Sequence, residues 1–301
     1  MTFPTIALLL ATTFSASPGP APQAPEDANE ARQQEPERLK AWPATKKAAV
    51  LRKEIALLRK GSTEGMIEKS SAALREFGAA AAPLLIEALG SSTLAAEKHA
   101  ATTERLVGIL DEITGAAHTR LIAAEFQSKS PRVRRWALMR AGAFPDEGLL
   151  KAAEQALANE VATPLEQFPD LPYQAAMTAT SSGSLKGLDA LYERSIQDWG
   201  KVGTSIRSAL ERVRGDAASA KFASLAGDKD RSKAVAALRM LAGCGTQAAI
   251  PSVRPHLKSK DASLLIAAIN ACRGIVDKDP PLARMSVFQA VERAKPWIER
   301  L

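Results

Sequence analysis

The feature that most constrains this chain is a short alanine-led segment that recurs along it and is usually followed by glycine. ALREFG and ALMRAG are two examples, and the copies lie 28 to 39 residues apart. A period of this size is typical of proteins built from stacked structural units. The leading alanines are Ala73, Ala101, Ala137, Ala176, Ala209, Ala237 and Ala268, and the glycines are Gly78, Gly108, Gly142, Gly183, Gly215, Gly243 and Gly274.

A second helical pattern follows each glycine. It is clearest in residues 81–92, 117–130 and 248–261, where apolar residues recur at three- and four-residue spacing and a short polar turn follows. Pro83 and Pro251 fall in early turns, where a missing N–H costs little. The repeating unit is therefore predicted to be helix, glycine turn, helix and polar turn.

The small residues have two predicted roles. Glycine just beyond a last helical turn suits a left-handed C-cap. Alanine and glycine also allow neighbouring helices to pass close to each other. A single hairpin cannot bury its apolar face, whereas stacked hairpins share a continuous core. The high alanine and leucine content, with aromatic residues at only 5%, also favours an all-α protein.

The units resemble those of the HEAT-repeat family. The strongest matches are SPRVRRWALMRAGAF at 130–144 and the region 230–275, in which an arginine position of the family is occupied by Arg134 and then by Lys233. The resemblance covers about residues 63–276 and is weakest at 159–205. It implies a right-handed α-solenoid of about six or seven stacked helix-turn-helix (HEAT-like) repeats with a concave face.

The ends of the array need caps, because a terminal repeat has one unpaired face. An amphipathic pattern predicts a capping helix at about 45–60, and a second pattern predicts a C-terminal helix at about 280–299. Residues 163–172 hold three prolines, and we expect this irregular insertion to break the helix pairing. The predicted solenoid as a whole spans 41–301.

The N-terminal residues differ in composition from the rest. A short apolar run and a small-residue site predict a signal peptide at 1–17, although this run lacks a preceding Lys or Arg. Residues 18–40, rich in Pro, Ala and Glu, are predicted to be a disordered linker. We therefore expect export to the periplasm or outside the cell. The alternative is a cytoplasmic protein with a disordered N-terminus.

Charge is distributed unevenly. The whole chain has a net charge of +7, from 40 basic and 33 acidic residues. Residues 1–37 contain five acids and one arginine, so the remainder holds 39 basic and 28 acidic residues, a net charge of +11. A basic body favours an acidic protein or peptide as partner, with nucleic acid as the alternative. The competing interpretation is an ordinary solvated basic surface.

The sequence offers few residues for chemistry. Its three histidines are far apart, and no metal-binding, nucleophile or phosphate-binding motif occurs, so we predict no catalytic residue, metal or cofactor. The two cysteines, Cys244 and Cys272, fall near corresponding positions of adjacent repeats. They are predicted either to form a disulfide in an oxidising compartment or to be small buried apolar residues.

Two basic and aromatic clusters are candidate binding surfaces. In the segment PRVRRWALMR, arginines next to a tryptophan could bind an acidic peptide, a phosphate group or a nucleic-acid base. A second, weaker cluster also combines a tryptophan with basic residues. The competing interpretation assigns Arg134 a structural role in the repeat and packs Trp136 between units. The candidate residues are Arg132, Arg135, Trp136 and Arg140 in one cluster and Trp199, Lys201 and Arg207 in the other.

The sequence thus predicts a non-enzymatic, monomeric scaffold that binds a partner on its concave face, without a membrane span. The alternative is a nucleic-acid-binding solenoid, because the family it resembles includes DNA-repair glycosylases with a basic concave face. The related bilin-lyase group is a third option, but no residue here matches a tetrapyrrole site.

Overall fold

The computed structural model describes residues 38–60, 63–94, 99–282 and 284–301. Every regular element in this part of the chain is helical, which confirms the all-α prediction. No helix in the described ranges is long and apolar enough to cross a bilayer. The predicted signal peptide at 1–17 and most of the predicted linker at 18–40 lie outside the described residues.

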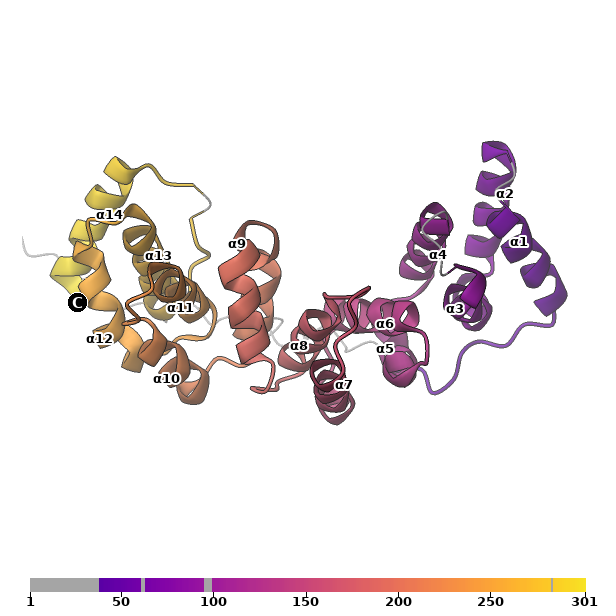
Figure 1. The fold of residues 1–301 in the computed structure, drawn as a ribbon, viewed down its shortest axis with the longest axis horizontal. Helices are drawn as coiled ribbons and strands as arrows, with labels where there is room; N and C mark the ends of the chain where they lie inside the picture. Colours follow the sequence, from indigo (N-terminus) through magenta and orange to yellow (C-terminus); the bar gives the residue numbers. More distant parts are fainter. Residues whose placement is uncertain (1–37, 61–62, 95–98, 283) are drawn as a thin grey trace, which may run out of the picture. The chain divides into compact units, whose positions relative to one another are not determined.

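Fourteen α-helices, joined by short 3₁₀ turns and one π-helical turn, make up the described chain (Figure 1). They are α1 (Ala48–Lys60), α2 (Glu64–Glu76), α3 (Ala82–Gly90), α4 (Ala100–Ile113), α5 (Thr119–Ala123), α6 (Pro131–Ala143), α7 (Leu150–Ala162), α8 (Leu171–Ser181), α9 (Leu188–Glu211), α10 (Asp216–Leu225), α11 (Arg231–Cys244), α12 (Ile250–Val253), α13 (Ala262–Cys272) and α14 (Val287–Arg300).

The helices contact one another mainly in chain order. The first helices of successive hairpins form a continuous series, in which α6 packs on α8, α8 on α9, α9 on α11, and α11 on α13. The helices between members of this series pack on the member that follows them in the chain, as α7 does on α8 and α10 on α11. Hairpins that follow each other in sequence are therefore neighbours in space.

Only two of the recurring glycines adopt the predicted left-handed conformation. Gly78 has φ of +55° and Gly183 has φ of +100°. Gly108 and Gly142 lie within α4 and α6, so for them the C-cap prediction is wrong.

Close approach of helices explains glycine at two other positions. A Cβ on Gly243 would lie 2.8 Å from Leu210 Cβ, and a Cβ on Gly274 would lie 2.0 Å from the Ala242 carbonyl oxygen. Neither distance is compatible with a side chain at these positions. The second predicted role of the small residues, close helix packing, is confirmed here.

The terminal helices differ from their predicted bounds. α1 begins at Ala48, close to the predicted capping helix at 45–60. The C-terminal helix begins at Val287 and not near 280, so that boundary was wrong. Ser286 starts α14 with a capping box: its hydroxyl accepts from the Gln289 N–H, and the Gln289 side chain accepts from the Ser286 N–H.

The proline-rich insertion does not separate its neighbours. Residues 163–170 form an irregular loop, but α7 and α8 on either side of it are in contact. The predicted break in helix pairing is therefore wrong, because a loop of this length can return the chain to its partner. The sharper irregularity is in α9, where Asp198 has φ of −149° and ψ of 48° and kinks the helix.

The residues that precede α1 form contacts with residues 117–146, which lie far from them in the sequence. The Leu39 N–H donates to the Ala117 carbonyl at 2.9 Å, and the Trp42 ring stacks on His118 with centroids 5.6 Å apart. Arg38 forms an ion pair with Asp146 at 3.3 Å. Residues 38–40 therefore belong to the folded body, and the predicted linker ends too late.

Candidate partner-binding grooves

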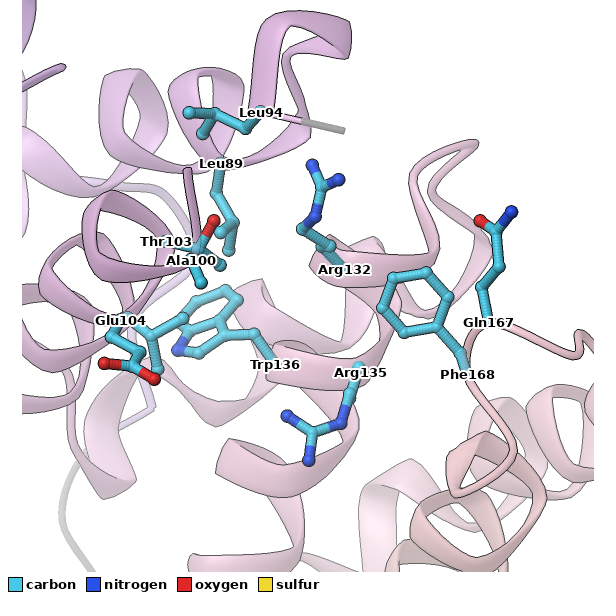
Figure 2. Close-up of a pocket in the computed structure, with 11 residues that line it drawn as sticks. Leu89, Leu94, Ala100, Thr103, Glu104, Arg132, Arg135, Trp136, Gln167 and Phe168 are labelled. Atoms are coloured by element: carbon cyan, nitrogen blue, oxygen red, sulfur yellow. The ribbon is translucent and has the colours of Figure 1, made fainter. Parts of the chain in front are cut away.

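The first predicted cluster lies beside an open groove of about 580 Å³, which we call the Trp136 groove (Figure 2). Its walls come from α3, α4, α6 and the loop before α8. The lining residues are Leu89, Leu94, Ala100, Thr103, Glu104, Val107, Arg132, Arg135, Trp136, Gln167 and Phe168.

Trp136 forms the floor of this groove and is only 3% exposed. Its indole N–H donates to Asp111 Oδ1 at 3.0 Å, which satisfies the one polar atom of the ring. Arg132 and Arg135 project from the same helix in different directions (Figure 2). The spacing of these residues placed the tryptophan and two arginines around one surface, as the sequence predicted.

Two arginines of the segment are paired within the protein. The Arg134 guanidinium donates to Glu160 Oε1 at 2.5 Å and to the Ser128 carbonyl at 2.9 Å, and Glu160 is 3% exposed. The Arg135 guanidinium donates to Asp170 Oδ2 at 2.7 Å. Arg134 therefore links α6 to α7 and to the turn before α6, which fits the structural role considered for it.

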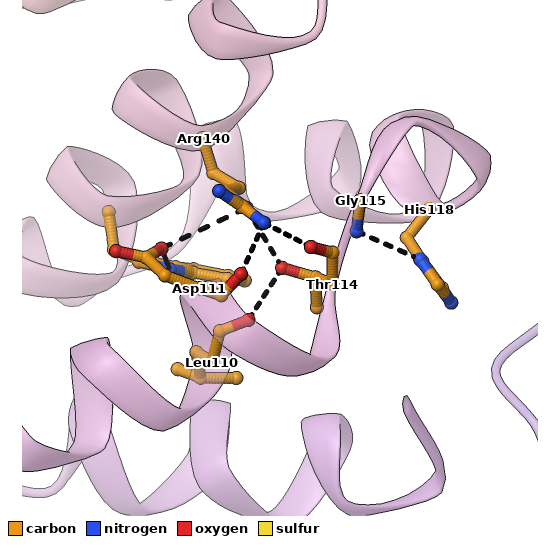
Figure 3. A network of polar contacts seen from close by, with 7 residues as sticks. Leu110, Asp111, Thr114, Gly115, His118 and Arg140 are labelled. Atoms are coloured by element: carbon orange, nitrogen blue, oxygen red, sulfur yellow. Dashed lines mark hydrogen bonds and ion pairs between the residues drawn. The ribbon is translucent and has the colours of Figure 1, made fainter. Parts of the chain in front are cut away.

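Arg140 of α6 does not line the groove. Its side chain reaches the C-terminal end of α4 (Figure 3). Its guanidinium donates to Thr114 Oγ1 at 3.1 Å and to the carbonyl oxygens of Asp111 and Thr114, and it stacks on Phe144 at 4.6 Å. Burial lowers the pKa of Arg140, and the nearby Asp111 carboxylate opposes this. The structure thus separates Arg140 from the other three candidates.

Arg132 is different from its neighbours in the segment. Across the described residues it forms no hydrogen bond or ion pair, although it lies in the groove wall. Glu104 lies in another part of the wall, so the groove presents both signs of charge around an apolar floor. Phe168 and Gln167 also line the groove and come from the proline-rich loop. The sequence did not predict them as binding residues, because the loop has no helical spacing from which their direction could be inferred.

The second predicted cluster also borders a groove, of about 530 Å³, which we call the Trp199 groove. Trp199 and Arg207 line it, but Lys201 does not: its ammonium group is 3.3 Å from Asp198 Oδ2 and its side chain is 82% exposed. The lining residues are Trp199, Gly200, Gly203, Thr204, Arg207, Arg239, Ala242, Ser263, Ile266, Ala267, Asn270, Pro280, Pro281 and Leu282.

Arg239 is the residue of this groove that sequence reasoning missed. Its guanidinium lies over the Trp199 ring, 5.2 Å from the centroid. It comes from AALRMLAGCG, a segment that helical periodicity explains fully as packing. Only the contact between α9 and α11 places its charged end beside the tryptophan.

The cysteines and histidines form no site in the described chain. Cys244 and Cys272 are both buried and present as free thiols, and burial raises the pKa of each to about 12. His118 Nδ1 accepts from the Gly115 N–H at 3.1 Å, and burial, together with the Arg140 charge, lowers the pKa of His118. Within the described residues, no three His, Cys, Asp or Glu side chains are grouped to hold a metal ion.

Comparisons with known proteins do not assign the chain to a family. No protein-family model matches the sequence, and no curated protein matches it. The likeness to HEAT repeats therefore stays a prediction from the sequence. The grooves themselves have apolar walls, aromatic side chains and a few charged groups, which is the chemistry of non-covalent recognition.

Proposed function

We propose that this chain is a non-enzymatic scaffold: a right-handed α-solenoid of about six or seven HEAT-like repeats that binds a protein or peptide partner as a monomer. The chain-order packing of the hairpins and the small residues at their seams support this architecture. α1 and α14 are the proposed caps at its ends. The Trp136 groove is the proposed binding surface.

One observation carries the proposal of a protein partner. The densest basic segment of the chain is largely neutralised from within, because Arg134, Arg135 and Arg140 bond to carboxylates or carbonyl oxygens of the same chain. Phosphate backbones are bound by several unpaired cations acting together. A buried tryptophan floor beside Arg132, which has no polar partner among the described residues, suits an amphipathic peptide better.

A site-specific photo-crosslinker tests this surface. We expect the full-length chain with benzoylphenylalanine at Phe168 to capture a discrete protein from extracts of its own cells, in nuclease-treated samples as well as untreated ones. The control carries the same group at Lys151, an exposed position on α7 outside the groove. Identical capture from both positions would argue against the groove.

The captured protein then gives an affinity test. Phe168→Ala is expected to weaken its binding about tenfold or more, since truncating a central aromatic contact commonly costs over 1 kcal/mol. Lys151→Ala is expected to leave the affinity unchanged. Equal effects of the two substitutions would remove the support for this surface.

The nucleic-acid alternative rests on the net charge of +11 beyond residue 37. It predicts affinity for DNA that falls steeply with salt, with a log–log slope that counts the phosphates neutralised. We expect a shallow slope or none for the full-length chain. A slope steeper than about −4 would favour this alternative.

We also propose that the protein is exported. The support is the composition of residues 1–17, which lie outside the described part of the chain. Protease treatment of intact cells, followed by N-terminal sequencing of the mature chain, tests this. Protection from protease together with an intact N-terminus would indicate a cytoplasmic protein.

A further inference from the structure

We infer that the Trp199 groove is a binding site for an acidic side chain of a polypeptide, with Arg239 as the group that binds its carboxylate. The site is separate from the Trp136 groove and does not depend on what that groove binds. Four features of the described residues carry the inference.

The first is the unpaired charge. Arg239 is half-buried, and among the described residues its only recorded contact of a polar or aromatic kind is with the Trp199 ring. Burial lowers its pKa, and no carboxylate among the described residues forms an ion pair with it. A desolvated guanidinium without a counter-charge is unfavourable, so a carboxylate that enters the groove offsets a cost already present in the fold.

The second is that the contact with the ring leaves the hydrogen-bonding groups unused. The guanidinium lies over the Trp199 ring, 5.2 Å from its centroid, and a contact of this kind is electrostatic. The N–H donors remain available for a carboxylate, which two of them can bind at once. The Trp199–Arg239 pair thus holds the cation in place without using its hydrogen bonds.

The third is the way the pair is built. A Cβ on Gly203 would lie 2.6 Å from Trp199 Cε2, so the ring rests on its own helix only because residue 203 is glycine. Elsewhere in the lining, Asn270 Oδ1 accepts from the Leu282 N–H at 2.9 Å, and Arg273 donates to the Pro280 carbonyl at 3.2 Å. Two parts of the groove are therefore held in position by contacts of the chain.

The fourth is the composition of the walls. The lining includes two arginines and no acidic residue, whereas the Trp136 groove includes Glu104. The second arginine, Arg207, has only a long ion pair of 4.0 Å, with Glu211. Much of the remaining wall is apolar, from Ile266 to Leu282, which suits the aliphatic neighbours of an acidic residue better than a phosphate backbone.

The test uses fluorescence anisotropy with the full-length chain. The probe is a fluorescein-labelled hexapeptide of alternating glutamate and leucine, and the matched probe has glutamine in place of glutamate. We expect the glutamate peptide to bind and the glutamine peptide to bind about tenfold more weakly or not at all.

Three substitutions locate the binding. Arg239→Met keeps the aliphatic stem but removes the charge, and is expected to weaken binding of the glutamate peptide about tenfold or more. Lys201→Met removes one charge from α9, the helix that carries Trp199, but outside the groove, and is expected to change binding less than about twofold. Phe168→Ala, in the other groove, is expected to have no effect.

Several results would overturn the inference: no binding of the glutamate peptide, equal binding of both peptides, or unchanged binding by R239M. Tighter binding of a single-stranded oligonucleotide that R239M abolishes would also overturn it, in favour of a nucleic-acid site. If thermal unfolding shows that R239M does not fold, Arg239→Lys replaces it. This variant keeps the charge but not the paired donors, and unchanged binding by it would equally count against the site.

Discussion

α6 adds paired arginines to its apolar contacts with neighbouring elements, whereas the buried residues of α11 are all uncharged. From α6, Arg134, Arg135 and Arg140 each bond to an acceptor on another element. From α11, ten of its fourteen residues are buried, and all ten are uncharged. They are Ala234, Val235, Ala236, Ala237, Leu238, Met240, Leu241, Ala242, Gly243 and Cys244.

The comparison shows that the same hairpin can be joined to its neighbours by two kinds of chemistry. Around α6, paired charges supplement the buried apolar residues of the helix. Around α11 the backbones approach so closely that Gly243 and Gly274 have no room for a side chain. The α6 seam should therefore be sensitive to charge and pH, and the α11 seam to added volume.

The largest expected effect is at the α11 seam. Gly274→Ala would place a Cβ against the Ala242 carbonyl, and the backbone must move to relieve the contact. We expect the free energy of unfolding to fall by about 3 kcal/mol or more, measured by urea denaturation.

Gly108→Ala is the matched control, because nothing lies within 4 Å of the Cβ it would add within α4. It is expected to stabilise the protein by about 0.5 to 1 kcal/mol through helix propensity. Similar losses for both variants would show that the α11 seam is not unusually close.

The next effect is at the α6 seam. Glu160→Gln removes one charge of a buried pair and leaves Arg134 without its counter-charge, so we expect a loss of about 3 kcal/mol in urea denaturation. The control is Glu112→Gln in the exposed pair with Arg75, which is expected to change stability by less than about 1 kcal/mol. A loss below 1 kcal/mol for Glu160→Gln would contradict the role given to this pair.

A smaller loss of stability is expected when the Asp146 carboxylate is protonated at low pH. Burial by itself raises the pKa of Asp146, but bonds from Arg120 and the Gly148 N–H, with the charges of Arg120 and Arg38, bring it below its ordinary value of 3.8. Because the folded-state pKa is lowered, this stabilisation is complete above that ordinary value and is lost as the pH falls through the folded-state pKa.

Asp146→Asn should therefore be less stable than the wild type at pH 7, by about 1 to 2 kcal/mol. The difference should narrow as the pH falls below about 4. Thermal unfolding across this range measures it. A constant difference at every pH would indicate that the carboxylate charge contributes nothing.

The smallest effect concerns the thiols of the α11 seam. Burial raises the pKa of both Cys244 and Cys272 to about 12, so little thiolate exists at pH 8. We expect iodoacetamide to modify neither cysteine in the folded protein and both in urea. Mass spectrometry of the untreated chain, purified from its own cells without reductant, tests the predicted disulfide at the same time, since a bond lowers the mass by about 2 Da.

The sequence predicted the positions of the helices more reliably than the roles of individual residues within them. Periodicity and small residues predicted the hairpins, the cap helix and the closeness of Gly243 and Gly274. The same pattern misassigned Gly108 and Gly142 as caps, because glycine inside a helix and glycine at its end look alike when only the spacing is known. It also extended the C-terminal helix too far, since apolar residues from 280 onward continue a helical pattern that the prolines interrupt.

The groove residues also include some that the sequence predicted and some that it did not. Helical spacing placed Arg132, Arg135 and Trp136 on one surface, because residues three and four apart share a face. It gave no information on Phe168, which reaches that surface from a loop 32 residues beyond Trp136 in the chain. Arg239 was not predicted as a binding residue, because the spacing of apolar residues around it indicated only a packed helix.

The sequence by itself determined that the described chain is helical, where its hairpins begin to repeat, and where small side chains recur. These properties depend on local spacing and helix propensity, which act within a few turns. The tertiary structure decided which arginines are neutralised and which are not. Arg134 meets Glu160 26 positions later and Arg135 meets Asp170 35 positions later, while no carboxylate of the described residues pairs with Arg239. Such pairings depend on how one hairpin rests on the next, and that geometry follows from the packing of whole helices.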